Sequence, residues 1–197
     1  MPNHSLPDLP AFGLPDSPLH NNSSYFGINF RYLAIMVVSE NVLKWALRFY
    51  PPLLFQRIWV IRFEKNFRGV KVKVNKSLIN NNYNNSIFGG TIFAAADPFY
   101  PLLFHQALTH KGYKVRVWLK SASINYVKPG RTDLFFNISL TEATIDEIEQ
   151  VLNTNGKHIK AYPIEMFNKE GELCVSVLSE IYIRNLDLTE TSNTVSI

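Results

Sequence analysis

Hydrophobic and polar positions alternate with a period of two in several segments of the chain. Residues 70–75, Val-Lys-Val-Lys-Val-Asn, place three valines on one face and polar side chains on the other. Such alternation is typical of a strand with one buried face. The strands predicted from this alternation and from the turns between them are residues 70–75, 113–120, 123–127, 134–140, 159–167 and 173–183.

Two turn signals separate neighbouring predicted strands. Residues 128–131, Lys-Pro-Gly-Arg, lie between 123–127 and 134–140, and residues 168–171, Asn-Lys-Glu-Gly, lie between the last two strands. Proline, glycine and asparagine favour the tight turns of hairpins. We therefore expect two hairpins, each joining strands that are adjacent in the sequence.

Longer apolar spacings predict helices. Residues 40–50 carry apolar positions at helical intervals and end at Pro51-Pro52, which should stop a helix there. Residues 53–58 fit a second short helical or extended piece. The longest apolar helical stretch runs from Ile87 to about Leu108, and its glycines and alanines would let a sheet approach closely. This stretch is the predicted central helix.

A third helix is predicted after residue 143. Thr144-Ile145-Asp146-Glu147 matches a capping box, with Thr144 as the N-cap and Glu147 reaching back to it. The helix should continue to Asn155 and stop at Gly156. Together with the strands, these helices predict an α+β fold in which one central helix covers one face of a sheet.

The chain divides into three parts by composition. Residues 1–37 form a predicted N-terminal extension that is partly disordered, because the first 24 residues are rich in Pro, Asn, Ser and Asp. Residues 38–185 form the predicted domain, and residues 186–197 a flexible tail. The apolar residues 26–38 fit an extra strand or helix packed on the domain.

Composition excludes several classes of protein. With 197 residues and 46% hydrophobic content, the chain suits one globular domain. A net charge of +4 is compatible with a phosphate-bearing ligand and too weak to argue for nucleic acid. No apolar run approaches 18 residues, and residues 1–24 carry no basic n-region, so we expect neither a membrane-spanning helix nor a secretory signal. The single cysteine, Cys174, fits a reducing compartment, so we expect a cytoplasmic protein.

Cofactor motifs are missing from the sequence. The five histidines show no metal-ligand spacing, and Cys174 has no cysteine partner for a metal site. The chain also lacks a G-x-S-x-G elbow, a P-loop and a dinucleotide fingerprint. We therefore expect neither a metal nor a cofactor.

The start of the central helix carries the strongest chemical signal. Gly89-Gly90 would expose backbone N–H groups at the positive end of a helix, where they can stabilise an oxyanion or a thioester carbonyl. Asp97 lies seven residues later and is a lone carboxylate among apolar residues, so it could act as a base or nucleophile. Two plainer readings remain open: the glycines could serve tight packing, and Asp97 could cap a helix beginning at Pro98.

Polar residues near this signal are candidates for substrate contact. Asn82, in an Asn-rich loop, could orient a substrate or a water, although loop asparagines more often form turns. Lys114, Lys120, Lys128 and Arg131 could meet the phosphates of a nucleotide tail, although exposed strand faces are normally charged.

The spacing Asn82-x5-Phe88-Gly89-Gly90-x6-Asp97 resembles the signature of the hotdog-fold acyl-CoA thioesterases, in their phenylacetyl-CoA thioesterase-like group. That group has Asn, five residues, His-Gly-Gly, six residues and Asp. The remainder, from about residue 41 to 184, is similar to an uncharacterised thioesterase-like branch of the same superfamily, including residues 125–131 and 168–172. One difference stands out: Phe88 occupies the position of the family's histidine.

The resemblance implies a hotdog fold, in which a curved antiparallel sheet wraps around a long central helix. It also implies a homodimer or dimer of dimers, with active sites at the subunit interface. Asp97, Gly90 and Asn82 would be catalytic, and Phe88, Gly89 and Thr91 would contact substrate together with Lys120, Lys128 and Arg131.

The implied activity is hydrolysis of an acyl-CoA or related thioester to free acid and thiol. The alternative is a non-catalytic hotdog domain that binds acyl-CoA or a lipid ligand, which the loss of the histidine favours. A third reading is a membrane-associated protein that uses residues 26–38 and Leu53-Leu54-Phe55.

Overall fold

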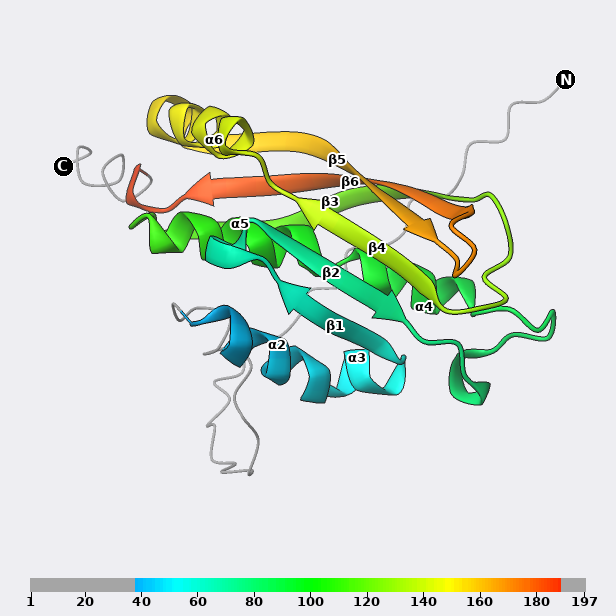
Figure 1. Cartoon of the computed structure of the whole chain (residues 1–197). Coiled ribbons are helices and arrows are strands. Elements are labelled where there is room, and N and C mark those ends of the chain that lie inside the picture. Colours follow the sequence, from blue (N-terminus) through cyan, green and yellow to red (C-terminus); the bar gives the residue numbers. More distant parts are fainter. Residues whose placement is uncertain (1–37, 189–197) are drawn as a thin grey trace, which may run out of the picture.

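The computed structural model describes residues 38–188 (Figure 1). Two short helices open this part of the chain, two consecutive helices cross its centre, and six strands form its sheet. The helices are α2 (Glu40–Phe49), α3 (Pro51–Phe55), α4 (Gly89–Ala96), α5 (Phe99–His110) and α6 (Glu142–Asn155), with 3-10 turns η1 (Lys65–Phe67) and η2 (Leu78–Asn80). The strands are β1 (Ile58–Phe63), β2 (Gly69–Val74), β3 (Val115–Tyr126), β4 (Leu134–Ser139), β5 (Lys157–Phe167) and β6 (Leu173–Asn185).

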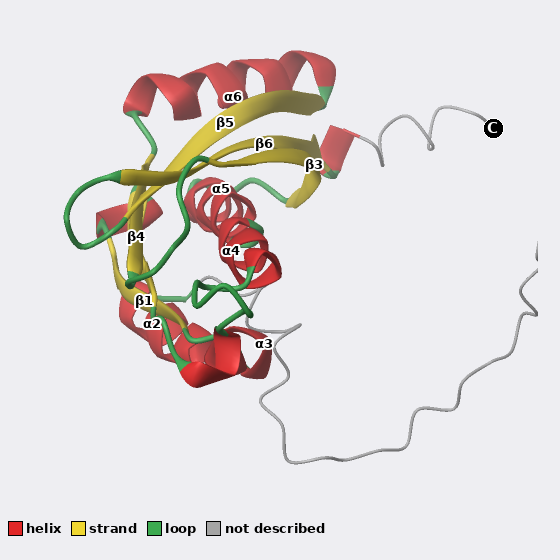
Figure 2. Ribbon diagram, turned by 90° about the vertical axis from the view of Figure 1, so that its right-hand side faces the viewer, coloured by secondary structure: helices red, strands yellow, loops and turns green. Residues whose placement is uncertain are grey.

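The strands form one antiparallel sheet in the order β1-β2-β4-β5-β6-β3. The sheet curves around α4 and α5, which lie inside the curve, whereas α6 lies on the outer face against β5 (Figure 2). The predicted architecture, a curved antiparallel sheet wrapped around a long central helix, is therefore confirmed. The predicted extension 1–37, the apolar segment within it and residues 189–197 lie outside the described residues.

The core lies between the concave face of the sheet and the central helices. In β2, Val70, Val72 and Val74 are fully buried, as the alternation predicts. In α5, Leu103 and Phe104 likewise have no exposed surface. Each such side chain contributes about 1.5–3 kcal/mol when it leaves water. This packing fixes the helix pair across the sheet.

One predicted hairpin is wrong and the other is correct. β5 and β6 pair across the turn at 168–171 as expected. β3, however, pairs with β6 at the sheet edge, and β4 pairs with β2 and β5. The Pro-Gly loop between β3 and β4 instead bonds to the Asn-rich loop, because its Gly130 carbonyl accepts a hydrogen bond from the Ile87 N–H at 2.9 Å. The Pro-Gly signal marks a local turn and does not choose the partner of each strand.

The start of α6 also differs from the prediction. Thr141, not Thr144, is the N-cap, and its hydroxyl accepts the Thr144 N–H at 3.1 Å. Glu147 pairs with Lys160 at 2.7 Å and does not reach back to the helix start. A threonine three residues earlier offers the same capping chemistry and gains one more helical turn. The predicted stop at Gly156 is confirmed by its left-handed φ of 70°.

The sequence pattern did not reveal β1, because its alternation is interrupted. The register of β1 against β2 shifts between Val60 and Arg62, and Ile61 bulges outward. The Arg48 guanidinium of α2 donates to the carbonyls of Val60 (2.9 Å) and Ile61 (3.3 Å). A side chain from another element therefore satisfies the carbonyls that the bulge leaves unpaired.

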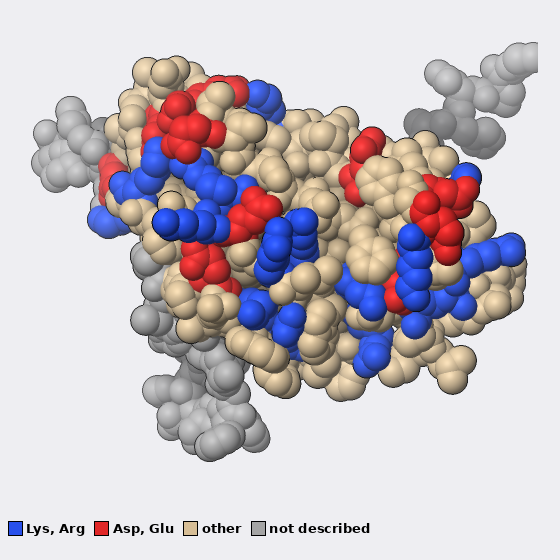
Figure 3. Space-filling model, viewed as in Figure 1, with Lys and Arg blue, Asp and Glu red and all other residues tan. Residues whose placement is uncertain are grey.

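Charged side chains are not spread evenly over the surface. Lys and Arg side chains lie toward both ends of the face shown, and one group lies at the right of the view, where the loops after β2, β3 and β5 meet, with some carboxylates among them (Figure 3). No helix within residues 38–188 is both long enough and apolar enough to span a membrane. Within the segment that suggested membrane contact, Leu53 is buried in the core and Phe55 is exposed.

Candidate functional site

The start of α4 brings several predicted site residues together. Gly89 and Gly90 form its first turn, Phe88 occupies the N-cap position, and no side chain caps the N–H groups. The first N–H groups of a helix have no partner within it. The Tyr126 hydroxyl, at the end of β3, donates to the Gly89 carbonyl at 2.9 Å. Thr91, also in the first turn, is buried.

Both glycines are crowded. A Cβ at Gly90 would overlap the Phe88 ring, and one at Gly89 would lie 3.1 Å from the Tyr126 hydroxyl oxygen. Any larger residue at these positions must displace an aromatic ring. The Phe88 side chain is 58% exposed, so its ring lies over the helix start and faces solvent.

Asn82 shapes the loop that leads into α4. Its side-chain oxygen accepts hydrogen bonds from the Asn84 N–H (3.0 Å), the Ser86 N–H (3.1 Å) and the Ser86 hydroxyl (3.1 Å). These bonds are those of a turn-forming asparagine. A role for Asn82 toward substrate stays a prediction.

Asp97 ends α4 and does not cap α5. Its backbone is helical, with φ −61° and ψ −54°, and Pro98 occupies the N-cap of α5 without a side-chain cap. The reading of Asp97 as a helix cap is therefore wrong. Pro98 has no N–H, which accounts for the break between the two helices. The buried neighbours Ala96 and Phe99 hold both helix ends against the core.

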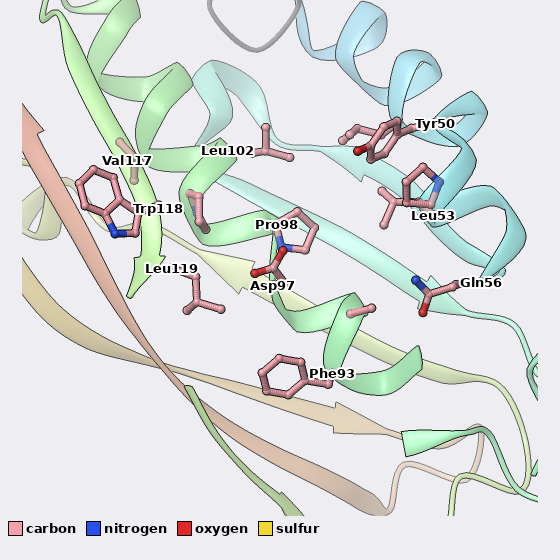
Figure 4. A pocket seen from close by; sticks show the side chains of 14 residues that line it. Tyr50, Leu53, Gln56, Phe93, Asp97, Pro98, Leu102, Val117, Trp118 and Leu119 are labelled. Carbon is pink, nitrogen blue, oxygen red and sulfur yellow. The ribbon is translucent and has the colours of Figure 1, made fainter. Parts of the chain in front are cut away.

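The Asp97 side chain lies in an apolar groove of about 730 Å³. Figure 4 shows its carboxylate between β3 on one side and α2 and α3 on the other, beside Pro98 and above Phe93. Asp97 is the only charged residue among those that line the groove: Leu47, Tyr50, Pro52, Leu53, Gln56, Phe93, Ala94, Asp97, Pro98, Pro101, Leu102, Val117, Trp118 and Leu119.

The groove changes the acidity of its carboxyl. Apolar walls remove part of the water around Asp97, and this desolvation raises the pKa of its carboxyl above the usual value. A carboxylate with a raised pKa is a stronger base than an ordinary surface aspartate. The groove therefore combines an apolar binding surface with one basic group.

The helix start and Asp97 are too far apart to act on one atom within one chain. Seven residues separate Gly90 from Asp97, which is about 10 Å along a helix axis. A reacting carbonyl must lie about 3 Å from both its hydrogen-bond donor and its base. Gly90 and Asp97 of one chain therefore do not meet at one reacting carbonyl.

The predicted phosphate-binding cations lie in different surroundings. Lys128 pairs with Glu172 at 2.7 Å, and Lys120 pairs with Glu180 at 3.1 Å. Arg131 is exposed and lines a separate pocket. Lys120 and Lys128 are therefore bound to carboxylates, one on β6 and one in the turn that precedes it.

Sequence reasoning missed two parts of the site. Tyr126 was not chosen as a site residue, and the walls from α2 and α3, such as Leu53 and Gln56, were not assigned to a groove. Both depend on contacts between distant parts of the chain, so no local pattern could indicate them. Within residues 38–188, no group of three or more His, Cys, Asp or Glu side chains could hold a metal ion.

Solved structures with the same fold include bacterial thioesterase-like proteins. A protein of unknown function and probable thioesterase from Pseudomonas aeruginosa is 14% identical, with a TM-score of 0.66, over 77% of this chain and 99% of that one. A protein of unknown function from Chlorobaculum tepidum is 13% identical, with a TM-score of 0.62, over 74% and 93%. A thioesterase from Haemophilus influenzae is 15% identical, with a TM-score of 0.56, over 77% and 94%.

These likenesses confirm the predicted hotdog fold, the fold of the thioesterase-like proteins that the sequence resembles. No curated protein matches the sequence. One family does match, over residues 40–183, which is most of the chain and includes the helix start, Asp97 and all six strands up to residue 183. The chain belongs to this family, described as a domain of unknown function, DUF4442.

Proposed function

We propose that this protein hydrolyses an acyl-CoA or a related acyl thioester to the free acid and the thiol. The observation that carries the proposal is the single carboxylate Asp97, with a raised pKa, in an otherwise uncharged and largely apolar groove. The apolar lining suits the acyl chain of a thioester, and the carboxylate supplies the base or nucleophile that hydrolysis needs. The P. aeruginosa and H. influenzae proteins of the same fold, described as a probable thioesterase and a thioesterase, support this reading.

The chemistry needs few groups. The Gly90 N–H, at the positive end of α4, polarises the thioester carbonyl and stabilises the oxyanion that forms on it. Asp97 either takes a proton from water, whose oxygen then attacks the carbonyl carbon, or attacks that carbon itself. The carbon–sulfur bond then breaks. In the first route the thiolate leaves with the proton that Asp97 took from water. In the second route attack leaves a mixed anhydride on Asp97, and water hydrolyses it, which releases the acid, regenerates the carboxylate and supplies the proton for the thiolate.

A second copy of the chain would complete the site. β3 lies at one end of the sheet, and within residues 38–188 no strand pairs with its outer edge. A twelve-residue open edge is a surface on which another strand can add. Val117 and Leu119 of β3 also line the groove, so a copy paired there would place its helix start beside Asp97. Each site then combines Asp97 of one subunit with Gly90 of the other.

A non-catalytic ligand-binding domain is the second candidate. Phe88 favours it, because a phenyl ring covers Gly90 where the similar thioesterases have a histidine that can form hydrogen bonds. Such a domain would bind acyl-CoA without releasing thiol. For either function we place the protein in the cytoplasm, since its one described cysteine, Cys174, is a buried free thiol.

A thiol-release assay over short, long and aromatic acyl-CoAs separates the two candidates. The thioesterase proposal predicts turnover that falls about 10²–10⁴-fold in Asp97→Asn, as expected for loss of a general base or nucleophile. Asp146→Asn is the matched control, because Asp146 is exposed on α6 and lies outside the groove. Saturable acyl-CoA binding without thiol release would favour the ligand-binding domain, and wild-type turnover in Asp97→Asn would exclude the proposed mechanism.

A further inference from the structure

A second pocket, of about 420 Å³, lies beside the Asn-rich loop and shares no residue with the groove. Three connections build it: the segment after β2, the loop between β3 and β4, and the turn between β5 and β6. These are the loops over which Lys and Arg gather in Figure 3. The residues that line the pocket are Lys76, Ser77, Leu78, Asn81, Asn85, Arg131, Thr132, Asp133 and Lys169.

The pocket carries an excess of positive charge. Lys76, Arg131 and Lys169 line it against one carboxylate, Asp133. That carboxylate is shared: it pairs with Lys169 at 3.3 Å and with Lys73 at 3.0 Å, and it accepts the Lys76 N–H at 2.9 Å. One negative charge therefore holds two lysines in place and neutralises only part of the cluster.

Arg131 is the cation most available to a ligand. It is exposed, and within residues 38–188 no carboxylate lies within salt-bridge distance of its guanidinium. A guanidinium offers paired donors that match the oxygens of a phosphate group. Leu78 adds an apolar surface to the same pocket, with its side chain 96% exposed. A nucleotide combines phosphates with a flat ring, which such an apolar side chain could contact.

The pocket is connected directly to the helix start. The Lys76 ammonium donates to the Asn85 side chain at 2.8 Å, and only four residues lead from Asn85 to Gly89, a span of at most about 14 Å. The Ile87 N–H donates to the Gly130 carbonyl, next to Arg131. A ligand anchored in the pocket by its phosphates could therefore extend a flexible arm to the N–H groups of α4.

We propose that this pocket binds the phosphate-bearing nucleotide of coenzyme A, with Arg131, Lys169 and Lys76 as the phosphate ligands. The choice of coenzyme A as the ligand rests on the proposed function, because it assumes that an acyl-CoA thioester reaches Gly90. The proposal assigns the phosphates to a different set of cations from Lys120 and Lys128, which are bound to carboxylates.

Calorimetry on the full-length wild-type chain tests the pocket, with free coenzyme A, adenosine 3′,5′-bisphosphate and pantetheine as probes. Coenzyme A and the bisphosphate should bind, pantetheine should bind at least about tenfold more weakly, and rising salt should weaken the first two. Arg131→Gln should weaken coenzyme A binding about tenfold, as should Lys169→Gln. Arg62→Gln, an exposed arginine on β1 outside the pocket, should bind like the wild type.

Two results would overturn the pocket proposal: equal affinity for coenzyme A and pantetheine, or unchanged coenzyme A affinity in both Arg131→Gln and Lys169→Gln. These measurements need no turnover, so they stay separate from the proposed function. If Asp97→Asn loses thiol release while both pocket variants bind coenzyme A like the wild type, the thioesterase proposal is supported and the pocket proposal is wrong. If the coenzyme A affinity depends on Arg131 but the protein releases no thiol, the pocket proposal is supported and the thioesterase proposal is wrong.

Discussion

At the scale of single residues, Asp97 is the group that most needs explaining. It lies at a helix break, makes no capping bond there, and occupies a groove whose other lining residues are uncharged. A carboxylate in such surroundings loses hydration without gaining a cation. Residues that cost stability in this way are typical of functional sites. The structure thus gives Asp97 no structural role that would account for its charge.

We predict that Asp97→Asn makes the protein slightly more stable at pH 7. Burial raises the pKa of the folded carboxyl above its unfolded value, so the ionised form costs free energy once the pH exceeds both values. Asparagine removes that cost, and water around the exposed side chain limits the gain in melting temperature to about 1–2 °C. Thermal unfolding of both proteins at pH 7 and near pH 3 measures this difference in melting temperature. The difference should vanish near pH 3, where the carboxyl is protonated. An Asp97→Asn variant that is less stable than the wild type at pH 7 would contradict the prediction.

The sequence predicted the glycine pair and Asp97 because their chemistry depends on positions close along the chain. It could not predict that Lys120 and Lys128 pair with carboxylates on other segments. Tyr126 was missed for the same reason, because its bond to the Gly89 carbonyl joins residues far apart in sequence. Local spacing identifies a reactive group, and only the fold shows which neighbours it has.

At the scale of elements, the alternation of valines and lysines predicted β2 because one face is buried. The sequence did not predict β1, because a bulge interrupts the alternation of its side chains. The predicted hairpin of β3 and β4 was wrong, because a turn signal does not determine which strands pair. α2 stabilises β1 through Arg48, whose guanidinium also stacks on the rings of Trp45 and Trp59, each 4.6 Å away.

We predict that Arg48→Met lowers the free energy of unfolding by about 1–3 kcal/mol. The substitution removes two hydrogen bonds from a charged donor to the carbonyls of the bulge and leaves those carbonyls without that donor. Chemical denaturation measures the change, with Arg62→Met, on the exposed face of β1, as the control. Equal stability of the two variants would show that the bulge does not depend on Arg48.

At the scale of the whole molecule, the open edge of β3 and the separation of Gly90 from Asp97 are both features that a dimer would explain. Phe93 and Trp118, which line the groove, are 38% and 40% exposed, and Tyr126 at the end of β3 is 49% exposed. Apolar side chains gathered beside an unpaired strand are typical of an interface. The homodimer stays a prediction, and it accounts for both features at once.

We predict that Phe93→Glu converts a dimer into a monomer. A carboxylate at the centre of an apolar interface must be desolvated without a partner, which opposes association. Analytical ultracentrifugation gives the mass, and Phe49→Glu, on an exposed phenylalanine of α2 outside the groove, serves as the control. A monomeric wild type, or a dimeric Phe93→Glu, would contradict the pairing.

The central claim, thioester hydrolysis by a site shared between two copies, is tested most directly by hybrid dimers. Gly90→Val should be inactive, because its side chain displaces the Phe88 ring over the helix start, and Asp97→Asn lacks the base. Co-expressing the two variants yields hybrids in which one of the two sites is intact, so we predict that each hybrid releases thiol from acyl-CoA at about half the wild-type rate. Hybrids as inactive as either parent would contradict the account.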